Sequence, residues 1–355
     1  MQNAFIKRAS IALAATQRHN WEHGTAMQAF LEAGDMDYVI AMAREAIYRQ
    51  MEDGRAAKLG TVDSVTDPCA CGEALIEAVC ATDDAILKDG LDKLLVWALQ
   101  KAPRNTDGVL YHVDCRPEFW SDSTYMLPPF LAAAGYYKEA LVNMDGYLDA
   151  MYDKSAHLMR HIWDDEKKEF IHAAFWGTGS GWTLAGLIRT AALLPEEMKE
   201  DRDRLRKICI ELLDSVLVYL REDGLFHDIL DDPSSFIETN MSQMTAYAIY
   251  RGVTEGWMDE AYIPYAEKMR NAALNNTDPY GFVTPVCGAP TFDKPGASPE
   301  AQAFSLMLEV AYATLHNEIQ IAFFDQHIYD VGGYGRLMSL EHFHKGSLVQ
   351  FVICE

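Results

Sequence analysis

The segment WSDSTYMLPPFL at residues 120–131 decides the fold, because in it a Trp-Ser-Asp turn leads directly into an apolar helix. Five further segments of the chain join a turn marked by Gly, Asp or Trp to an apolar stretch in the same way. They recur at steps of 51, 50, 59, 57 and 62 residues, which suits one helix, a connection and a second helix per repeat. The steps are counted at Trp21, Gly72, Asp122, Gly181, Glu238 and Glu300. The sequence therefore predicts an all-α ring of six helical hairpins.

The two helices of each hairpin are expected to differ in composition. Those that follow the marked turns are the more apolar and should form the inner wall: 74–79, 125–134, 184–194, 241–250 and 303–312. Other segments carry apolar residues at every third or fourth position with charges between them, which is typical of outer helices. These are 36–51, 81–101, 198–220 and 259–273. The turns that lead into the inner helices would gather at one end of the ring, where we expect the functional site.

Length and composition are those of an ordinary globular protein, with 355 residues, 49% apolar and 23% charged. No Pro-, Gly- or Ser-rich linker interrupts the repeat, so we expect one barrel domain over residues 1–315. The formal net charge of −23, without a basic run, disfavours nucleic acid and anionic membranes as partners. No apolar stretch is long enough to span a membrane. The sequence is compatible with a monomer or a homodimer.

The last 40 residues depart from the helical pattern. Residues 319–324 and 347–354 alternate or run apolar like strands, around a glycine turn at 332–335. We expect residues 316–355 to form a short non-helical tail, with a hairpin packed on the barrel.

The seven cysteines are odd in number and scattered, with no paired C-x-x-C spacing. Cys69 and Cys71 are too close for an ordinary disulfide, and a zinc site would lack a second ligand pair. Lys7 and Arg8 before the apolar residues 9–15 faintly resemble a signal peptide. The apolar run is short, however, and cleavage after it would remove the helix that pairs with the Trp21 turn. We therefore expect a cytoplasmic, reduced protein.

Asp67 and Asp122 stand at the beginnings of two successive inner helices. Each has a structural interpretation, since Asp is a preferred N-cap whose backbone hydrogen bonds are worth about 1 kcal/mol. Asp67-Pro68 in particular is typical of a cap followed by a first-turn proline. In the functional interpretation, both carboxylates face one funnel lined by Trp and Tyr. Paired carboxylates in such a pocket suit general acid–base chemistry on a sugar.

Two histidines and a glycine-rich loop lie in neighbouring turns. His112 and His161 are each, taken alone, more often structural than functional. The stretch WGTGSGW at residues 176–182 has three alternate glycines, which let backbone approach a ligand closely, and two indoles that can stack on sugar faces. A phosphate-binding loop is a poor interpretation, because no strand precedes the stretch and its lysine is missing.

Taken together, these elements resemble the unsaturated uronyl hydrolases, glycoside hydrolase families 88 and 105, which include unsaturated rhamnogalacturonyl hydrolases. The matching motifs run in order from Trp21 to about Tyr312. They are Asp67-x4-Gly72-Glu-Ala-Leu, His112 with Trp120-x-Asp122-x3-Met126-x2-Pro129-Phe-Leu, His161-x-Trp163-Asp164, Trp176-Gly-x-Gly-x-Gly-Trp182, Ser235-x2-Glu238-Thr239 and Ser298-Pro-Glu-x-Gln302-Ala-Phe. The resemblance implies an (α/α)6 barrel, which agrees with the repeat.

The resemblance also implies a substrate, an oligosaccharide with a 4,5-unsaturated uronic acid left at its non-reducing end by a polysaccharide lyase. The aspartate that matches Asp122 would protonate C4 of the double bond and activate the water that adds at C5, after which the hemiketal collapses and releases the sugar. Asp67 would be the second carboxylate. The residues expected to bind substrate are Trp21, His112, His161, Trp163, Trp176, Thr178, Ser180, Trp182 and Arg116. Neither a metal nor an organic cofactor is implied.

One loop departs from the family pattern. It usually reads Trp-Gly-Arg-Gly-Asn-Gly-Trp, and its arginine suits planar, bidentate pairing with the substrate carboxylate. This chain has Thr178 and Ser180 instead, so either Arg116 or Arg160 supplies the charge from an adjacent turn, or the substrate differs. Two alternatives remain open: a sugar isomerase or epimerase that uses a histidine pair on the same barrel, and a carbohydrate-binding relative without catalysis.

Overall fold

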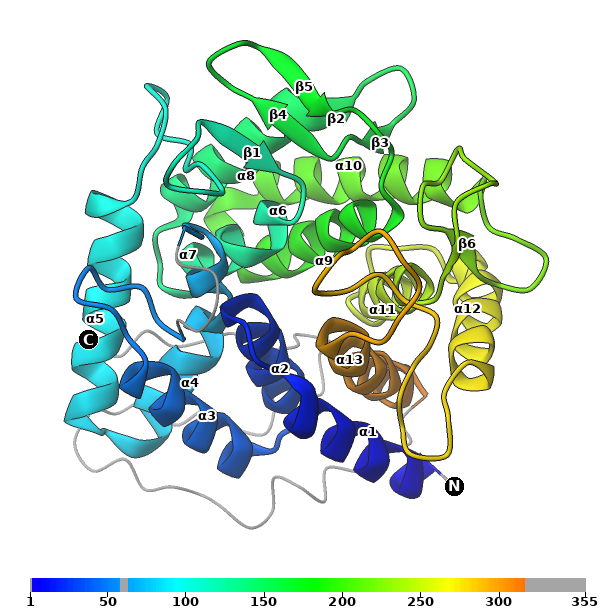
Figure 1. The fold of residues 1–355 in the computed structure, drawn as a ribbon, viewed down its shortest axis with the longest axis horizontal. Helices are drawn as coiled ribbons and strands as arrows, with labels where there is room; N and C mark the ends of the chain where they lie inside the picture. The colour runs from blue at the N-terminus through cyan, green and yellow to red at the C-terminus, as the bar shows by residue number, and fades with distance from the viewer. Residues whose placement is uncertain (1, 58–62, 317–355) are drawn as a thin grey trace.

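The computed structural model describes residues 2–57 and 63–316, and within them the chain forms a closed ring of six helical hairpins (Figure 1). The inner wall consists of α2 (Asn20–Glu32), α4 (Gly72–Thr82), α6 (Ser123–Met126) with α7 (Pro128–Ala133), α9 (Gly177–Leu193), α11 (Asn240–Thr254) and α13 (Pro299–Leu315). The outer layer consists of α1 (Gln2–Thr16), α3 (Met36–Tyr48), α5 (Ala85–Val96), α8 (Tyr137–Met151), α10 (Lys199–Leu217) and α12 (Ile263–Asn275). The predicted all-α barrel is confirmed. The expected C-terminal tail lies outside the described residues.

The amino-terminal helix closes the ring. Helix α1 packs against α13, and α13 in turn packs against α2, so the two ends of the described chain meet at one seam (Figure 1). The outer partner of the last inner helix is therefore the first helix of the chain. Among the described residues, no helix has the length and hydropathy needed to span a membrane.

Burial follows the apolar pattern of each layer. In inner helix α9, every residue from 177 to 191 is buried, because α9 has neighbours on all sides. Outer helix α10 buries one stripe: Leu205, Cys209, Leu212, Leu213 and Val216. These positions recur every three or four residues, the spacing typical of an amphipathic helix with one buried face.

Two predicted helices have different bounds in the structure. The inner segment expected at 125–134 is divided into α6 and α7 at Pro128-Pro129, since proline donates no backbone hydrogen bond within a helix. The outer segment expected at 81–101 begins later, because α4 continues to Thr82 and Asp84 caps α5 by accepting a hydrogen bond from the Ile86 amide at 2.8 Å. A π-helical turn, η2 (Trp97–Lys101), ends it.

Short strands, which the sequence analysis did not predict, occupy the connections that precede inner helices. Strands β1 (Glu118–Trp120), β4 (Ile162–Asp164) and β5 (Glu169–His172) form an antiparallel sheet in the order β1-β4-β5. The pairs β2 (Tyr152–Asp153) with β3 (Leu158–Met159) and β6 (Phe226–His227) with β7 (Ile237–Glu238) are two-stranded. The 3-10 turns are η1 (Asp67–Cys71), η3 (Glu196–Met198) and η4 (Glu260–Tyr262). We call the end of the ring where the inner helices begin the mouth.

Candidate active site

Two carboxyl groups at the mouth lie on either side of one imidazole. Nε2 of His112 is 3.7 Å from Oδ1 of Asp67, and its Nδ1 is 3.5 Å from Oδ1 of Asp122. The same Nδ1 lies 3.0 Å from the Ser123 hydroxyl and 3.1 Å from that of Thr66. The structure thus brings together both predicted carboxylates and the first predicted histidine.

The Asp122 side chain does not serve as a helix cap, although Asp122 occupies the N-cap position of α6. Its side chain is 16% exposed, but the Oδ1 atom is buried and, among the described residues, has no hydrogen-bond partner. Burial raises the pKa of Asp122 to about 7, against the lowering effect of the backbone amides of Asp122 and Ser123. For the other helix start, the N-cap position is Thr66, and Asp67 is the first residue of η1. Asp122 therefore makes no capping bond to α6, and Asp67 lies one residue past the N-cap position of its turn.

His112 lies flat against Trp120, with ring centroids 4.3 Å apart and planes 10° from parallel. Its pKa is lowered, chiefly by burial, although Asp67 and Glu118 act in the opposite direction. A neutral imidazole between two carboxyl groups can accept a proton from one and pass it to the other, and it carries no permanent positive charge.

His161 lies between two indoles, 4.3 Å from the Trp176 ring and 6.1 Å from the Trp120 ring by centroid. Burial lowers the pKa of His161 to about 3, and His172 and His112 lower it further. Its Nδ1 lies 2.8 Å from Nδ1 of His172, an exposed residue of β5 that the sequence analysis missed. Only the strand register, which was not predicted, could have indicated His172.

A second set of acidic residues, Asp228, Glu238 and Glu300, lies beyond Trp176 at the mouth. The Trp176 indole donates to Asp228 at 3.2 Å, and burial raises the pKa of Asp228 to about 6. Burial likewise raises the pKa of Glu238 to about 8 and that of Glu300 to about 7. The Trp21 indole donates a hydrogen bond to Glu300. Trp21, one of the predicted substrate-binding residues, therefore lies at the mouth. The sequence analysis used Glu238 and Glu300 as repeat markers and as members of the family motifs, gave neither a role at the site, and did not single out Asp228.

Thr178 and Ser180 lie in the first turn of α9 and are buried. Within the described structure, neither hydroxyl has a hydrogen-bond partner, and the same is true of the Ser121 hydroxyl. A Cβ added at Gly179 would lie 2.4 Å from the Ser121 oxygen and 2.8 Å from the Trp176 ring. The central glycine of the loop therefore allows α9 to approach the turn that carries Asp122.

Two predicted tryptophans lie away from the His112 cluster. Trp182 is 3% exposed and packs between Tyr125 and Phe304, where it belongs to the core. Trp163 pairs with Phe119 across β4 and β1, on the face of the sheet opposite to Trp120.

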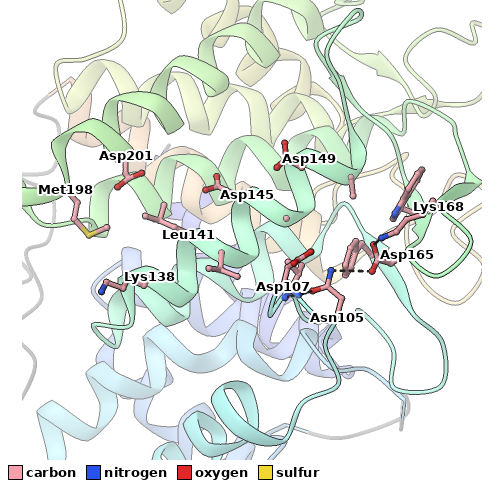
Figure 2. Close-up of a pocket in the computed structure, with 16 residues that line it drawn as sticks. Asn105, Asp107, Lys138, Leu141, Asp145, Asp149, Asp165, Lys168, Met198 and Asp201 are labelled. Atoms are coloured by element: carbon pink, nitrogen blue, oxygen red, sulfur yellow. Dashed lines mark hydrogen bonds and ion pairs between the residues drawn. The ribbon is translucent and has the colours of Figure 1, made fainter.

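Trp163 instead lines a separate open hollow of about 890 Å³ beside α8 (Figure 2). Its rim carries Asp107, Asp145, Asp149, Asp165 and Asp201 against Lys138 and Lys168. This excess of carboxylates disfavours an acidic oligosaccharide there. Among the described residues, no cluster of His, Cys, Asp and Glu could hold a metal ion.

The two arginines proposed to replace the loop arginine differ in their availability. Arg160 is held by Asp153 at 2.6 Å and donates to the Ala173 carbonyl at 2.7 Å. Arg116 is 54% exposed and pairs with Glu118 at 3.2 Å, and Glu118 also accepts a hydrogen bond from the Trp120 indole. Arg116 is therefore the better placed of the two to reach a ligand that lies on Trp120.

An all-helical barrel with paired carboxyls, neutral imidazoles and indoles at its mouth defines a class, that of the α-helical carbohydrate-active enzymes. The model of Glycosyl Hydrolase Family 88 matches residues 1–296, and the chain belongs to this family of glycoside hydrolases.

Comparison with known proteins gives relatives that match most of this chain and most of their own length. The chain is 26% identical over 291 residues to the unsaturated rhamnogalacturonyl hydrolase YesR of Bacillus subtilis, which covers 75% of this chain and 78% of that protein. A family 105 glycoside hydrolase of C. acetobutylicum superposes with a TM-score of 0.76 at 19% identity, covering 88% of this chain and 100% of the other. A possible family 105 member from Salmonella enterica gives 0.77 at 19% identity, covering 90% and 94%. The solved structures establish the fold.

Proposed function

We propose that this enzyme removes a 4,5-unsaturated uronic acid from the non-reducing end of oligosaccharides produced by polysaccharide lyases, those of rhamnogalacturonan in particular. Family membership and the name of the Bacillus relative support this substrate class. The observation that carries the proposal is the carboxyl of Asp122 beside His112. With its pKa raised to about 7 and its side chain 16% exposed, this carboxyl can be an acid at neutral pH within reach of a ligand.

In the proposed reaction, Asp122 first gives its proton to C4 of the double bond, and positive charge develops at C5 and the ring oxygen. The resulting Asp122 carboxylate then takes a proton from the water that adds at C5. The product of this hydration is a hemiketal, whose ring opens to a C5 ketone and leaves a hemiacetal at C1. That hemiacetal collapses and releases the remaining sugar. The same carboxyl is regenerated in its acid form.

The residues around Asp122 contact its carboxyl or provide surfaces and donors for the sugar. His112 separates Asp122 from Asp67, so that the two carboxyl groups share one neutral imidazole. Trp120, which is partly exposed, offers apolar surface for the sugar ring, and Trp176, 8% exposed, packs against His161. The unpartnered hydroxyls of Thr178 and Ser180 are donors that a bound sugar can satisfy.

Turnover in deuterated water tests the proposal. One deuterium should appear at C4 of the released uronic acid, together with loss of the double-bond ultraviolet absorbance. Because C4 lies beside the new ketone, unlabelled product incubated alone with the solvent is the control for exchange. Label at another carbon, or an intact glycosidic bond, would contradict the hydrolase and favour an isomerase. Binding without turnover would leave only a carbohydrate-binding protein.

A further inference from the structure

His161 and His172 form a ring-to-ring pair at the mouth. Their Nδ1 atoms are 2.8 Å apart, their centroids 5.0 Å apart, and their planes meet at 71°. Since Nδ1 of His161 is engaged in this pair, Nε2 is the ring nitrogen left for a ligand. The two indoles beside His161, Trp120 and Trp176, limit where the ring can turn.

A bulge in β5 determines which face of the sheet His172 occupies. Phe170 lies opposite Trp163, and His172 lies opposite Ile162, so Ile171 is an extra residue in β5. In a regular strand, Phe170 and His172 would share one face, because side chains alternate with a period of two. The extra residue moves His172 to the other face, the one on which Ile162 lies opposite Trp120. Bulges are known to redirect a side chain in this way next to active sites.

One proton lies between the two Nδ1 atoms, and its position decides what His161 presents to a ligand. His161 is neutral, since burial, His172 and His112 all lower its pKa. A neutral imidazole has one N–H, so if His172 donates, His161 carries its proton on Nε2. If His172 accepts, Nε2 of His161 presents a lone pair instead.

The exposure of His172 favours donation by His172. A doubly protonated imidazole has no lone pair on its ring nitrogens and can therefore only donate. The neutral form can donate as well. His172 can therefore donate its Nδ1–H whether its imidazole is cationic or neutral, whereas it can accept a hydrogen bond only when its imidazole is neutral.

We propose that His172 is a positioning residue that donates its Nδ1–H to His161 and thereby makes His161 present an Nε2–H donor to the uronyl group of the substrate. The identity of the substrate rests on the proposed function above. The tautomer of His161 does not, and it can be measured without any substrate.

Nitrogen NMR of the imidazoles tests the tautomer in the full chain. The His161 signals, assigned by their loss in His161→Gln, should show a protonated Nε2 in the wild type and in His172→Asn, whose amide can also donate. In His172→Asp the carboxylate can only accept, so the proton should move to Nδ1 of His161. A wild-type proton on Nδ1, or an unchanged tautomer in His172→Asp, would overturn the proposal.

Kinetics test the consequence for the substrate. His172→Ala should raise KM about tenfold, the loss of about one hydrogen bond, and change kcat less than about threefold. His172→Asn should restore most of the loss, and Glu169→Gln, a change at another exposed residue of β5, should leave KM unchanged. A wild-type KM in His172→Ala, or no rescue by asparagine, would overturn the positioning role. Absence of turnover in every variant and in the wild type would refute the proposed function alone, because the NMR result still decides the role of His172.

Discussion

At the scale of the residue, the position of Asp122 matters less than its surroundings. An aspartate at a helix start usually accepts backbone hydrogen bonds and stays ionised. Here the carboxyl makes no capping hydrogen bond to α6, lies beside His112, and has a pKa raised to about 7. The resulting acid is suited to give up a proton near neutral pH.

Replacing Asp122 by asparagine should leave the fold intact and lower kcat by about 10²–10⁴, the usual worth of a general acid. The amide keeps the shape of the side chain but has no acidic proton to transfer. Steady-state kinetics on a lyase-generated oligosaccharide measure the loss, with circular dichroism as the check on folding. A variant that keeps more than about a tenth of the wild-type kcat would show that Asp122 is not the proton donor.

The same variant should be more stable than the wild type, and more so at pH 8 than at pH 5. The pKa of Asp122 is about 7 in the folded protein, whereas the ordinary value for an aspartate is 3.8. The folded state therefore binds the proton more tightly, and its stability falls as pH rises from about 4 through 7. Asparagine does not titrate, so the gain in Tm over the wild type should grow over this range. An equal offset at both pH values would mean that Asp122 ionises normally.

Arg116 should recognise the substrate carboxylate in place of the loop arginine. Arg116→Ala is expected to raise KM about tenfold, near the low end for a charge-assisted hydrogen bond, because the guanidinium is exposed. Thr178→Arg in that background should restore part of the loss. The methyl ester of the substrate is the internal control, on which Arg116→Ala should change little. Equal wild-type activity on acid and ester would rule out carboxylate recognition.

At the scale of the element, the sequence predicted what depends on local chemistry. Turn residues and apolar spacing predicted the inner helices. They also predicted that Asp67, His112 and Asp122 lie at the same end of the ring. The strands were missed because segments of two to four residues carry too little alternation to detect. The bulge at Ile171 and the face on which Trp163 lies depend on strand register, which pairs residues from different connections. Trp163 was accordingly expected at the site and lies on the far side of the sheet.

Two glycines of α9 should separate activity from stability. In Gly179→Ala, the new Cβ would meet the side chains of Ser121 and Trp176, which can shift, so kcat/KM should fall at least about tenfold with little change in Tm. In Gly186→Ala, it would come within 2.2 Å of the Thr124 carbonyl, a backbone atom, and overpacking should cost about 1–3 kcal/mol. Thermal unfolding and kinetics on both variants measure the contrast. The reverse pattern would contradict this account of the loop.

At the scale of the whole molecule, the barrel depends on a contact between its most distant parts. Helix α1 packs on α13, almost 300 residues further along the chain, and completes the ring on which the inner turns are arranged. The mouth receives side chains from connections and from the first turns of inner helices, such as Trp21 of α2 and Glu300 of α13. Loosening the seam is therefore expected to affect the site without any change in a site residue.

Leu13 of α1 tests the seam, because its side chain is fully buried in the main core. Leu13→Ala should lower the free energy of unfolding by about 2–5 kcal/mol, whereas Ile11→Ala, 54% exposed on the same helix, should change it by less than about 0.5 kcal/mol. Native-state hydrogen exchange then shows where the ring opens. If the seam is the weak point, the amides of α1 and α13 should lose protection before those of α9, which α11 separates from α13 around the ring. Uniform loss of protection in all three helices would instead show that the barrel opens only as one cooperative unit.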